Sequence, residues 1–178
     1  IDNNKGIMYV PSSNLAKIAS IKKVKGKYNY YKYRPITETL FDQYGYPGTK
    51  PPWGNITAID LNNGKIKWQI PFGEYSELTK KNIPITGQTN MGGVTGTGAN
   101  LIFATGTLDK KIRAFDSRNG KQVWSYELPF IGSSPPTIYE HNDEQYILVT
   151  ATGSISLFSE YQNIAKLGNK VLAFKVKY

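Results

Sequence analysis

The chain has 178 residues, of which 22 are basic and 13 acidic, with one histidine, no cysteine and a formal net charge of +9. This composition excludes disulfide bonds and thiolate metal sites, and a zinc site is not expected with a single histidine. No run of 18 apolar residues occurs, so we expect no transmembrane helix.

Short strand-like segments separated by turns begin the chain, and long helical patterns are few. Residues 6–10 predict a strand followed by a turn at 11–14, and the apolar stretch 15–21 predicts a second strand or a short helix. Residues 34–53 are rich in Gly and Pro, and we expect them to be irregular. Long loops on a β scaffold usually carry function or cover a sheet edge.

Cations alternate with tyrosines between these segments. Such a surface could meet nucleic acid or anionic lipid, and aromatic side chains among cations can stack bases. No recognised nucleic-acid motif accompanies the stretch, so we expect an exposed loop pinned by its tyrosines and no nucleic-acid partner. The residues are Lys22, Lys23, Lys25, Lys27, Lys32 and Arg34, with Tyr28, Tyr30, Tyr31 and Tyr33.

One sequence motif occurs twice, in residues 57–68 (TAIDLNNGKIKW) and 113–124 (RAFDSRNGKQVW). Both copies fit A-[IF]-D-x-[NR]-N-G-K-x-x-W, and they are 56 residues apart. Each copy has a strand-like run, a turn and a second strand ending in Trp, which indicates a β-hairpin. A fixed period of this size indicates a repeat architecture, and stacked hairpin units of this kind form the blades of a β-propeller.

The matched residues have structural roles. The glycines occupy turn positions that need positive φ, the aspartates cap the same turns, the tryptophans pack between blades, and the alanines allow close sheet packing. None of these roles implies catalysis. The residues are Ala58, Asp60, Gly64 and Trp68, matched by Ala114, Asp116, Gly120 and Trp124.

The remaining elements continue the pattern to the end of the chain. Asp109 is expected to cap its turn, and His141 to be exposed in a polar turn rather than to bind a ligand. We expect blade repeats near 55–105 and 111–151 and a closing strand at 170–176. The predicted strands are 55–60, 65–70, 101–105, 111–115, 121–126, 136–140 and 145–151, with a long connection at 73–93.

These segments resemble a known family. The repeats are similar to the tryptophan-docking motif of the pyrroloquinoline quinone (PQQ)-dependent dehydrogenases. Further motifs resemble the glucose-dehydrogenase-like branch of that family over nearly the whole chain. They are residues 6–14 (GIMYVPSSN), 50–54 (KPPWG), 89–93 (TNMGG), 104–116 (ATGTLDKKIRAFD) and 135–152 (PPTIYEHNDEQYILVTAT).

The resemblance implies an eight-bladed propeller with PQQ on its axis, held by a divalent cation that is usually Ca²⁺. Two or three blades cannot close a ring, because open blades leave apolar faces and unpaired edges exposed. We therefore expect residues 1–178 to be an all-β, partial eight-bladed β-propeller, the C-terminal portion of one propeller domain. The chain begins at Ile1 rather than Met, as a processed product or fragment would, and it would pair with the remaining blades or with a second copy.

The resemblance also marks candidate cofactor neighbours. Asn90 aligns with a family Asn near the quinone and would hydrogen-bond a quinone oxygen, or it orders its own turn. Gly92 and Gly93 would let the backbone approach the cofactor, or make a turn. Trp53 either lines the propeller funnel or packs between blades. The family's catalytic Asp and most cation ligands lie upstream of the matched region, so we expect no catalytic residue and no metal ligand in this chain.

One departure bears on the cofactor site. The family has Gly-Gly-His-Gly after its last full strand, and the His reaches the cofactor. The matching run here is 152–155 (TGSI), so Ser154 replaces the His and removes a hydrogen-bond donor and a possible proton carrier. Either the cofactor site is altered at Ser154, or this member has moved toward a scaffold role.

The resulting expectation is part of a periplasmic PQQ-dependent dehydrogenase, associated with the inner membrane through its parent chain. The enzyme would oxidise a sugar or an alcohol and pass electrons to a quinone or a cytochrome, while this fragment alone would be inactive. The alternative is a non-catalytic PQQ-like propeller that binds proteins and holds no cofactor.

Overall fold

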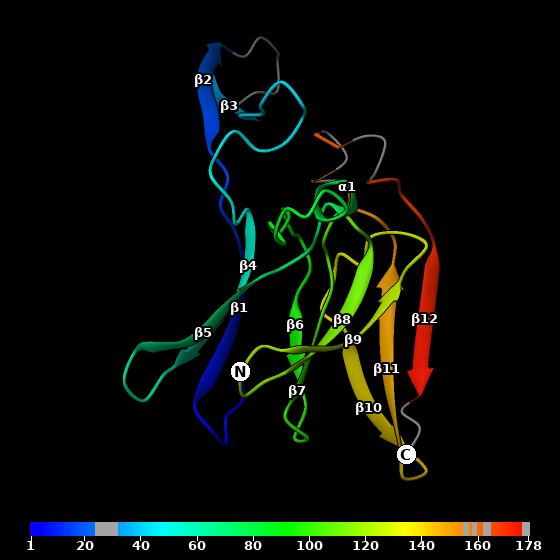
Figure 1. The fold of residues 1–178 in the computed structure, drawn as a ribbon. Coiled ribbons are helices and arrows are strands. Elements are labelled where there is room, and N and C mark those ends of the chain that lie inside the picture. The colour runs from blue at the N-terminus through cyan, green and yellow to red at the C-terminus, as the bar shows by residue number, and fades with distance from the viewer. Residues whose placement is uncertain (24–31, 155–156, 158–159, 162–164, 176–178) are drawn as a thin grey trace.

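The computed structural model describes residues 1–23, 32–154, 157, 160–161 and 165–175. They form three antiparallel sheets that lie side by side, and a separate two-stranded hairpin (Figure 1). The all-β prediction is confirmed. The elements are β1 (Ile7–Ser13), β2 (Lys17–Lys23), β3 (Tyr33–Thr39), β4 (Gly54–Asp60), β5 (Lys65–Pro71), α1 (Ser76–Thr79), β6 (Val94–Gly96), β7 (Leu101–Ala104), β8 (Lys111–Asp116), β9 (Gln122–Glu127), β10 (Thr137–His141), β11 (Glu144–Ala151) and β12 (Lys170–Lys175).

Each of the three sheets corresponds to a blade. The first blade has the strand order β1-β4-β5, the second β6-β7-β8-β9 and the third β10-β11-β12. The repeat aligns β4 with β8, and Ala173-Phe174 of β12 matches Ala114-Phe115 of β8. In the described residues, the first blade thus corresponds to strands two to four of the second blade, and the third blade to strands one to three. Segment 55–105 spans the last two strands of the first blade and reaches β7 of the second.

The two copies of the repeat fold in the same way. Both form an antiparallel hairpin, β4–β5 and β8–β9, with a register shift directly after the matched alanine. Gly64 and Gly120 have φ of 70° and 75°, as predicted. Within each turn, the aspartate accepts a 2.9 Å hydrogen bond from the amide two residues later. The turn roles assigned from the sequence are therefore confirmed.

The tryptophans lie between neighbouring blades, as predicted. Trp68 of the first blade donates its ring N–H to the carbonyl of Ser117 in the second blade, at 3.0 Å. Its ring lies against Gly120, where an added Cβ would come within 2.9 Å of the ring carbons. Trp124 of the second blade has its ring centroid 5.3 Å from that of Phe174 in the third. A repeat residue on each outer strand thus joins one blade to the next.

Apolar side chains fill the space between the sheets. The cluster between the first and second blades is centred on Ile56, Phe72, Ile102 and Phe115. The cluster between the second and third blades includes Phe103, Ile112, Leu128, Ile147 and Val149. The outermost strand β9 is exposed along its whole length, while the third strand β8 is buried from Ile112 to Phe115. Burial therefore peaks in the middle of each blade, as stacked sheets require.

The N-terminal part differs from the prediction in two respects, and it settles one alternative that the sequence left open. The turn expected at 11–14 is wrong, because β1 continues through Pro11 to Ser13 and pairs with the start of β4. Pro11 is tolerated there because β1 is the edge of its sheet in this chain. Residues 34–53 are not wholly irregular, because their first part pairs with β2 as β3. The stretch 15–21 contributes a strand rather than a helix.

Candidate functional site

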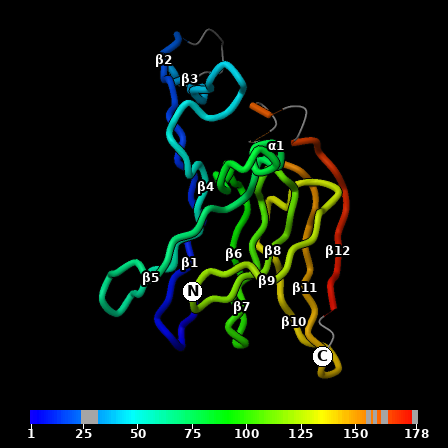
Figure 2. The backbone as a smooth tube through the Cα atoms, in the orientation of Figure 1, coloured from blue at the N-terminus to red at the C-terminus, as the bar shows by residue number. Residues whose placement is uncertain are grey.

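All the long connections of the three blades lie at one end of the molecule, which we call the long-loop end. Adjacent strands are antiparallel, so second-to-third-strand connections and blade-to-blade connections share an end. The opposite end carries the short turns (Figure 1; Figure 2). Every predicted cofactor neighbour lies on or beside a long connection. The connections are residues 14–53, 72–93, 105–110, 128–136 and 152–169.

One hydrophobic cluster ties these five connections together, and Trp53 is part of it. Trp53 is buried with Tyr75, Leu108, Ile131 and Leu157, so each connection contributes a side chain. The Trp53 ring stacks on the ring of Tyr46, with 5.8 Å between the ring centroids. Its ring N–H donates to the carbonyl of Thr49 at 2.7 Å. Trp53 therefore packs among the long connections, and its predicted role beside the cofactor stays a prediction.

Asn90 fastens the first blade to the second. It is nine-tenths buried, and its side-chain nitrogen donates to the carbonyl of Ser12 at 3.0 Å. Its backbone N–H donates to the hydroxyl of Ser13 at 3.1 Å, and it forms an isolated bridge with Thr107. The Asn90 amide therefore orders the connection between β5 and β6 against the end of β1.

Gly92 and Gly93 are glycines because the protein's own backbone lies against them. A Cβ on Gly92 would collide with the carbonyl of Thr105, and one on Gly93 with the ring of Pro135. Neither residue has positive φ. Backbone bonds from Met91 to the carbonyl of Gly106, at 3.0 Å, and from Thr105 to that of Gly93, at 3.3 Å, seal this contact. The pair permits a close approach, and its partner in this chain is protein.

Ser154 is buried at the start of the last long connection. Its hydroxyl accepts the backbone N–H of Leu157 at 3.4 Å, and the preceding Gly153 has φ of 75°. Gly153 is held in place by its backbone N–H, which donates to the carbonyl of Ile131 at 2.9 Å, and by the hydroxyl of Ser133, which donates to the Gly153 carbonyl at 2.7 Å. The Ser154 hydroxyl therefore helps to order its own loop, and its predicted place beside the cofactor stays a prediction.

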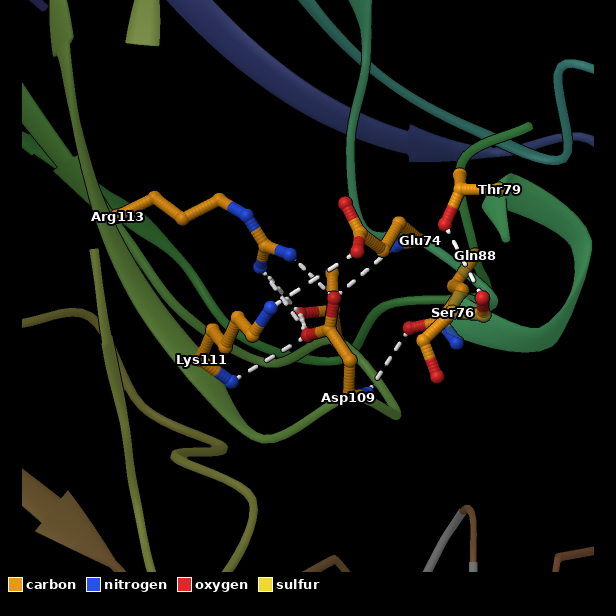
Figure 3. A network of polar contacts seen from close by, with 8 residues as sticks. Glu74, Ser76, Thr79, Gln88, Asp109, Lys111 and Arg113 are labelled. Atoms are coloured by element: carbon orange, nitrogen blue, oxygen red, sulfur yellow. Dashed lines mark hydrogen bonds and ion pairs between the residues drawn. The ribbon is translucent and has the colours of Figure 1, made fainter. Parts of the chain in front are cut away.

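The most extensively bonded polar group at this end is Asp109 (Figure 3). Its carboxylate pairs with both terminal nitrogens of Arg113, accepts the Thr107 hydroxyl at 2.6 Å, and accepts the backbone N–H groups of Glu74 and Lys111 at 3.0 and 3.3 Å. The Arg113 side chain is 4% exposed and that of Asp109 10%. Burial alone raises the pKa of Asp109, but the Arg113 guanidinium and the other donors lower it below its ordinary value on balance.

This buried pair was missed in the sequence, where Asp109 was assigned only a turn cap. The cap exists, since Lys111 donates its backbone N–H to Asp109, but it is a minor part of the network. The signal that could have revealed the pair is Arg113 itself, a cation in the middle of the apolar run KIRAF. A guanidinium in a buried strand requires a carboxylate partner.

A cleft of about 340 Å³ lies beside this network at the long-loop end. Gln88 and Asp109 form part of its wall, with Tyr46, Tyr75 and Tyr161. The hydroxyls of Tyr75 and Tyr161 are buried and find no hydrogen-bond partner among the described residues. Burial raises the pKa of Tyr75 well above its ordinary value and that of Tyr161 to about 12, so both stay protonated. None of the five predicted cofactor neighbours lines this cleft.

The described part of the chain does not by itself fit a PQQ and Ca²⁺ site. Within it, no three His, Asp or Glu side chains group where they could hold a metal ion. Asn90 is the residue assigned to a quinone oxygen, and one of the two N–H groups of its side-chain amide donates to the Ser12 carbonyl. The predicted cofactor roles of Trp53, Asn90, Gly92, Gly93 and Ser154 therefore stay predictions. No helix among the residues described has the length and apolar character needed to span a membrane.

The blades, their tryptophan docking and their loop arrangement define a partial propeller of the quinoprotein type. The family model for the glucose/ethanol/alcohol dehydrogenase β-propeller domain, a PQQ family, matches residues 1–147. The chain belongs to this family. The resemblance read from the motifs is thereby confirmed.

Two curated relatives illustrate the similarity. The chain is 39% identical over 128 residues to the glycerol dehydrogenase large subunit of Gluconobacter thailandicus, covering 68% of this chain and 17% of the relative. It is 34% identical over 129 residues to the quinate/shikimate dehydrogenase (quinone) of Acinetobacter baylyi, covering 68% of this chain and 16% of the relative. The chain thus spans about one sixth of the length of these relatives.

A solved structure confirms the partial-propeller fold. A europium-containing methanol dehydrogenase superposes with a TM-score of 0.67 at 18% identity, covering 98% of this chain and 32% of the other. Nearly the whole chain therefore has the fold of about one third of that methanol dehydrogenase chain.

Proposed function

We propose that this chain is part of a PQQ-dependent dehydrogenase that oxidises a sugar or an alcohol and passes electrons to a quinone or a cytochrome. The observation that carries the proposal is the family match over residues 1–147. The names of the two relatives, a glycerol dehydrogenase and a quinate/shikimate dehydrogenase (quinone), support a hydroxyl-bearing substrate and a quinone acceptor. We place the protein in the periplasm on the same family ground.

The proposal divides the work between this chain and the rest of the protein. Residues outside this chain would supply the catalytic carboxylate and the Ca²⁺ ligands, because the described residues contain no cluster of that kind. This chain would supply a rigid long-loop end. Its rigidity comes from the buried Asp109–Arg113 pair and from the anchoring of Asn90 on Ser12. PQQ, when bound, would supply the hydride-accepting quinone.

The remaining blades are the first expected partner. The edges of β1 and β12 have no further strand beside them in the described part of the chain. Val171 on β12 is largely exposed, and Trp124, which joins the second blade to the third, is 38% exposed. Open sheet edges and exposed aromatic rings favour association. We infer that further blades, or a second copy of this chain, cover these surfaces.

The test uses the natural protein purified from its source cells and loaded with PQQ and Ca²⁺. The expected result is quinone absorbance that stays with the protein on gel filtration, and dye-linked oxidation of at least one member of a panel of aldoses, polyols and primary alcohols. If the loaded protein neither retains the quinone nor oxidises any member of the panel, the proposal is refuted. A control protein carrying the family's His in place of Ser154 (Ser154→His) tests whether that position limits cofactor affinity.

The second candidate is a propeller that binds proteins and holds no cofactor. It is favoured by Ser154, whose hydroxyl is committed to the Leu157 amide where the family has a cofactor-facing His. A stoichiometric quinone in the protein isolated from cells would exclude it.

A further inference from the structure

The β2–β3 hairpin is the one pair of named strands that does not belong to a blade. It projects beyond the blades at the long-loop end (Figure 1). Its base is fastened by Glu160, which pairs with Lys17 at 3.3 Å and accepts the hydroxyl of Thr39 at 2.8 Å. Every residue of β2 is exposed, as are most of β3. We call residues Lys17–Lys23 and Tyr33–Thr39 the basic arm.

Residues 17–39, which begin and end with the strands of the basic arm, account for most of the net positive charge of the chain. Residues 17–39 contain seven Lys and Arg and one Glu, a net charge of +6 out of the +9 of the whole chain. All 13 acidic residues of the chain lie in its described part. None of them forms an ion pair with Lys22, Lys23 or Arg34.

The strand register sharpens this imbalance. Lys22 pairs directly with Arg34 across the hairpin. Like charges opposite one another in an antiparallel pair destabilise it. An external anionic surface would remove this repulsion, because it supplies the counter-charge that the chain lacks.

Exposed apolar side chains accompany the cations. Ile21 is 76% exposed, Ile18 59% and Tyr33 54%. Ile21 and Lys23 lie on one face of the hairpin, where they are paired with Pro35 and Tyr33. A nucleic acid would engage the cations but would leave the isoleucines in water. The interface of a lipid bilayer accommodates all three kinds of side chain, with cations at the headgroups, Tyr at the boundary and Ile in the acyl region.

We propose that the basic arm binds the headgroup region of an anionic lipid bilayer and turns the long-loop end of the propeller toward the membrane. Each cation near such a surface strengthens binding roughly fivefold, and the attraction falls with salt. A second consequence rests on the proposed function: a lipid-soluble quinone acceptor would then meet the protein at the end where its loops gather.

The test places an environment-sensitive fluorophore on the arm of the natural protein, in a background without other reactive cysteines. Ser20→Cys labels the arm, and Ser125→Cys on β9, also exposed, is the matched control. With vesicles of equal parts phosphatidylglycerol and phosphatidylcholine, we expect a blue shift and quenching by nitroxide lipids at position 20 but not at position 125. This readout reports the arm itself, whatever anchors the rest of the protein.

Charge variants then measure the electrostatic contribution. Neutralising the three arm cations (Lys22→Gln, Lys23→Gln and Arg34→Gln) should weaken the apparent affinity for anionic vesicles, measured from the fluorescence shift, roughly a hundredfold. The matched triple variant neutralises Lys65, Lys67 and Lys121, which are exposed on the outer strands and turns of the blades, and should change it little. Ile21→Ser should reduce the quenching depth while leaving the salt dependence in place.

Three results would overturn the proposal: no shift with anionic vesicles, an equal shift with pure phosphatidylcholine, or an equal loss in the two triple variants. Tight retention of the labelled arm by single-stranded DNA, with no response to vesicles, would assign the arm to nucleic acid instead. The assay needs neither PQQ nor turnover, so its failure is distinguishable from a failure of the proposed dehydrogenase activity.

Discussion

Removing the carboxylate of Asp109 should destabilise the protein more than any other single polar change at the long-loop end. Asp109→Ala leaves the Arg113 guanidinium, 4% exposed, without its counter-ion. Breaking a buried ion pair by deleting one partner costs about 3–5 kcal/mol, because the remaining charge is desolvated and unpaired. The Thr107 hydroxyl and two backbone N–H groups also lose their acceptor. We therefore expect a loss toward the upper part of this range.

The double variant Asp109→Ala/Arg113→Met separates this explanation from a general packing defect. Replacing the guanidinium by an apolar side chain of similar length removes the unpaired charge, so the double variant should be no less stable than Asp109→Ala alone. The exposed pair of Arg118 and Asp116 supplies the control. Arg118→Met should change stability little, because the Asp116 turn cap persists and water screens the lost charge.

The assay is urea unfolding of the natural protein, followed by tryptophan fluorescence, with the free energy of unfolding extrapolated to water. If unfolding is irreversible, unfolding rates at a fixed temperature replace the equilibrium values. A loss below about 1 kcal/mol for Asp109→Ala, or additive losses in the double variant, would refute the reasoning, since either result means that Arg113 is solvated without its partner.

Four further predictions follow from the same structure. The pKa of Asp109 is depressed on folding, so the Asp109–Arg113 pair contributes its full stability above the ordinary pKa of 3.8 and loses it as pH falls through the lower folded value. In Asp109→Asn, the free energy of unfolding measured by acid unfolding should therefore change less between pH 4 and pH 2 than in the natural protein. Trp68→Phe removes the N–H that meets the Ser117 carbonyl and should cost about 1–2 kcal/mol, whereas the same stability without the N–H would show that the ring alone joins the blades. Gly92→Ala forces a Cβ into the Thr105 carbonyl and should cost several times the roughly 1 kcal/mol expected for Gly64→Ala, where positive φ strains the Cβ but nothing lies within 4 Å; equal unfolding midpoints would contradict the close approach. Asn90→Ala should lower stability by about 1–2 kcal/mol through the lost bond to Ser12, and a parallel loss of PQQ affinity in the loaded protein, measured by quinone absorbance, would establish the cofactor role predicted for Asn90.

The features predicted correctly are those set by short stretches of sequence. The hairpin of each repeat follows from its aspartate, glycine and alternating strand, all within twelve residues. The docking of Trp68 follows from repetition, because a large flat residue at a fixed place in every unit must meet the neighbouring unit. The family motifs then identified the propeller.

The features missed depend on residues that are distant in sequence. Pro11 suggests a turn by itself, but its strand continues because Gly54–Ile56, more than 40 residues away, pair with it. One donor to Asp109 is the backbone N–H of Glu74, 35 residues away on the connection between β5 and β6, and no local pattern predicts it. The other, Arg113 on β8, is indicated in the sequence only as a cation within an apolar strand. The amide of Asn90 is likewise taken by Ser12, 78 residues earlier. The role of a buried polar residue depends on which hydrogen-bonding groups the fold places next to it, and these cannot be identified from the neighbouring sequence.

Buried contacts between the long connections make the long-loop end rigid. Trp53 packs against four other connections, Asn90 ties the first blade to the second, and Gly153 ties the third blade to the connection at Ile131. A catalytic group placed on loops needs this support, because misplacement of reacting atoms by about 1 Å can cost roughly a hundredfold in rate. The scaffold alternative would need only the blade surfaces, and it gives no reason for the loops to be cross-linked through buried charges. The buried Asp109–Arg113 pair and the cross-linked loops thus give this chain the rigidity that the proposed enzyme would require.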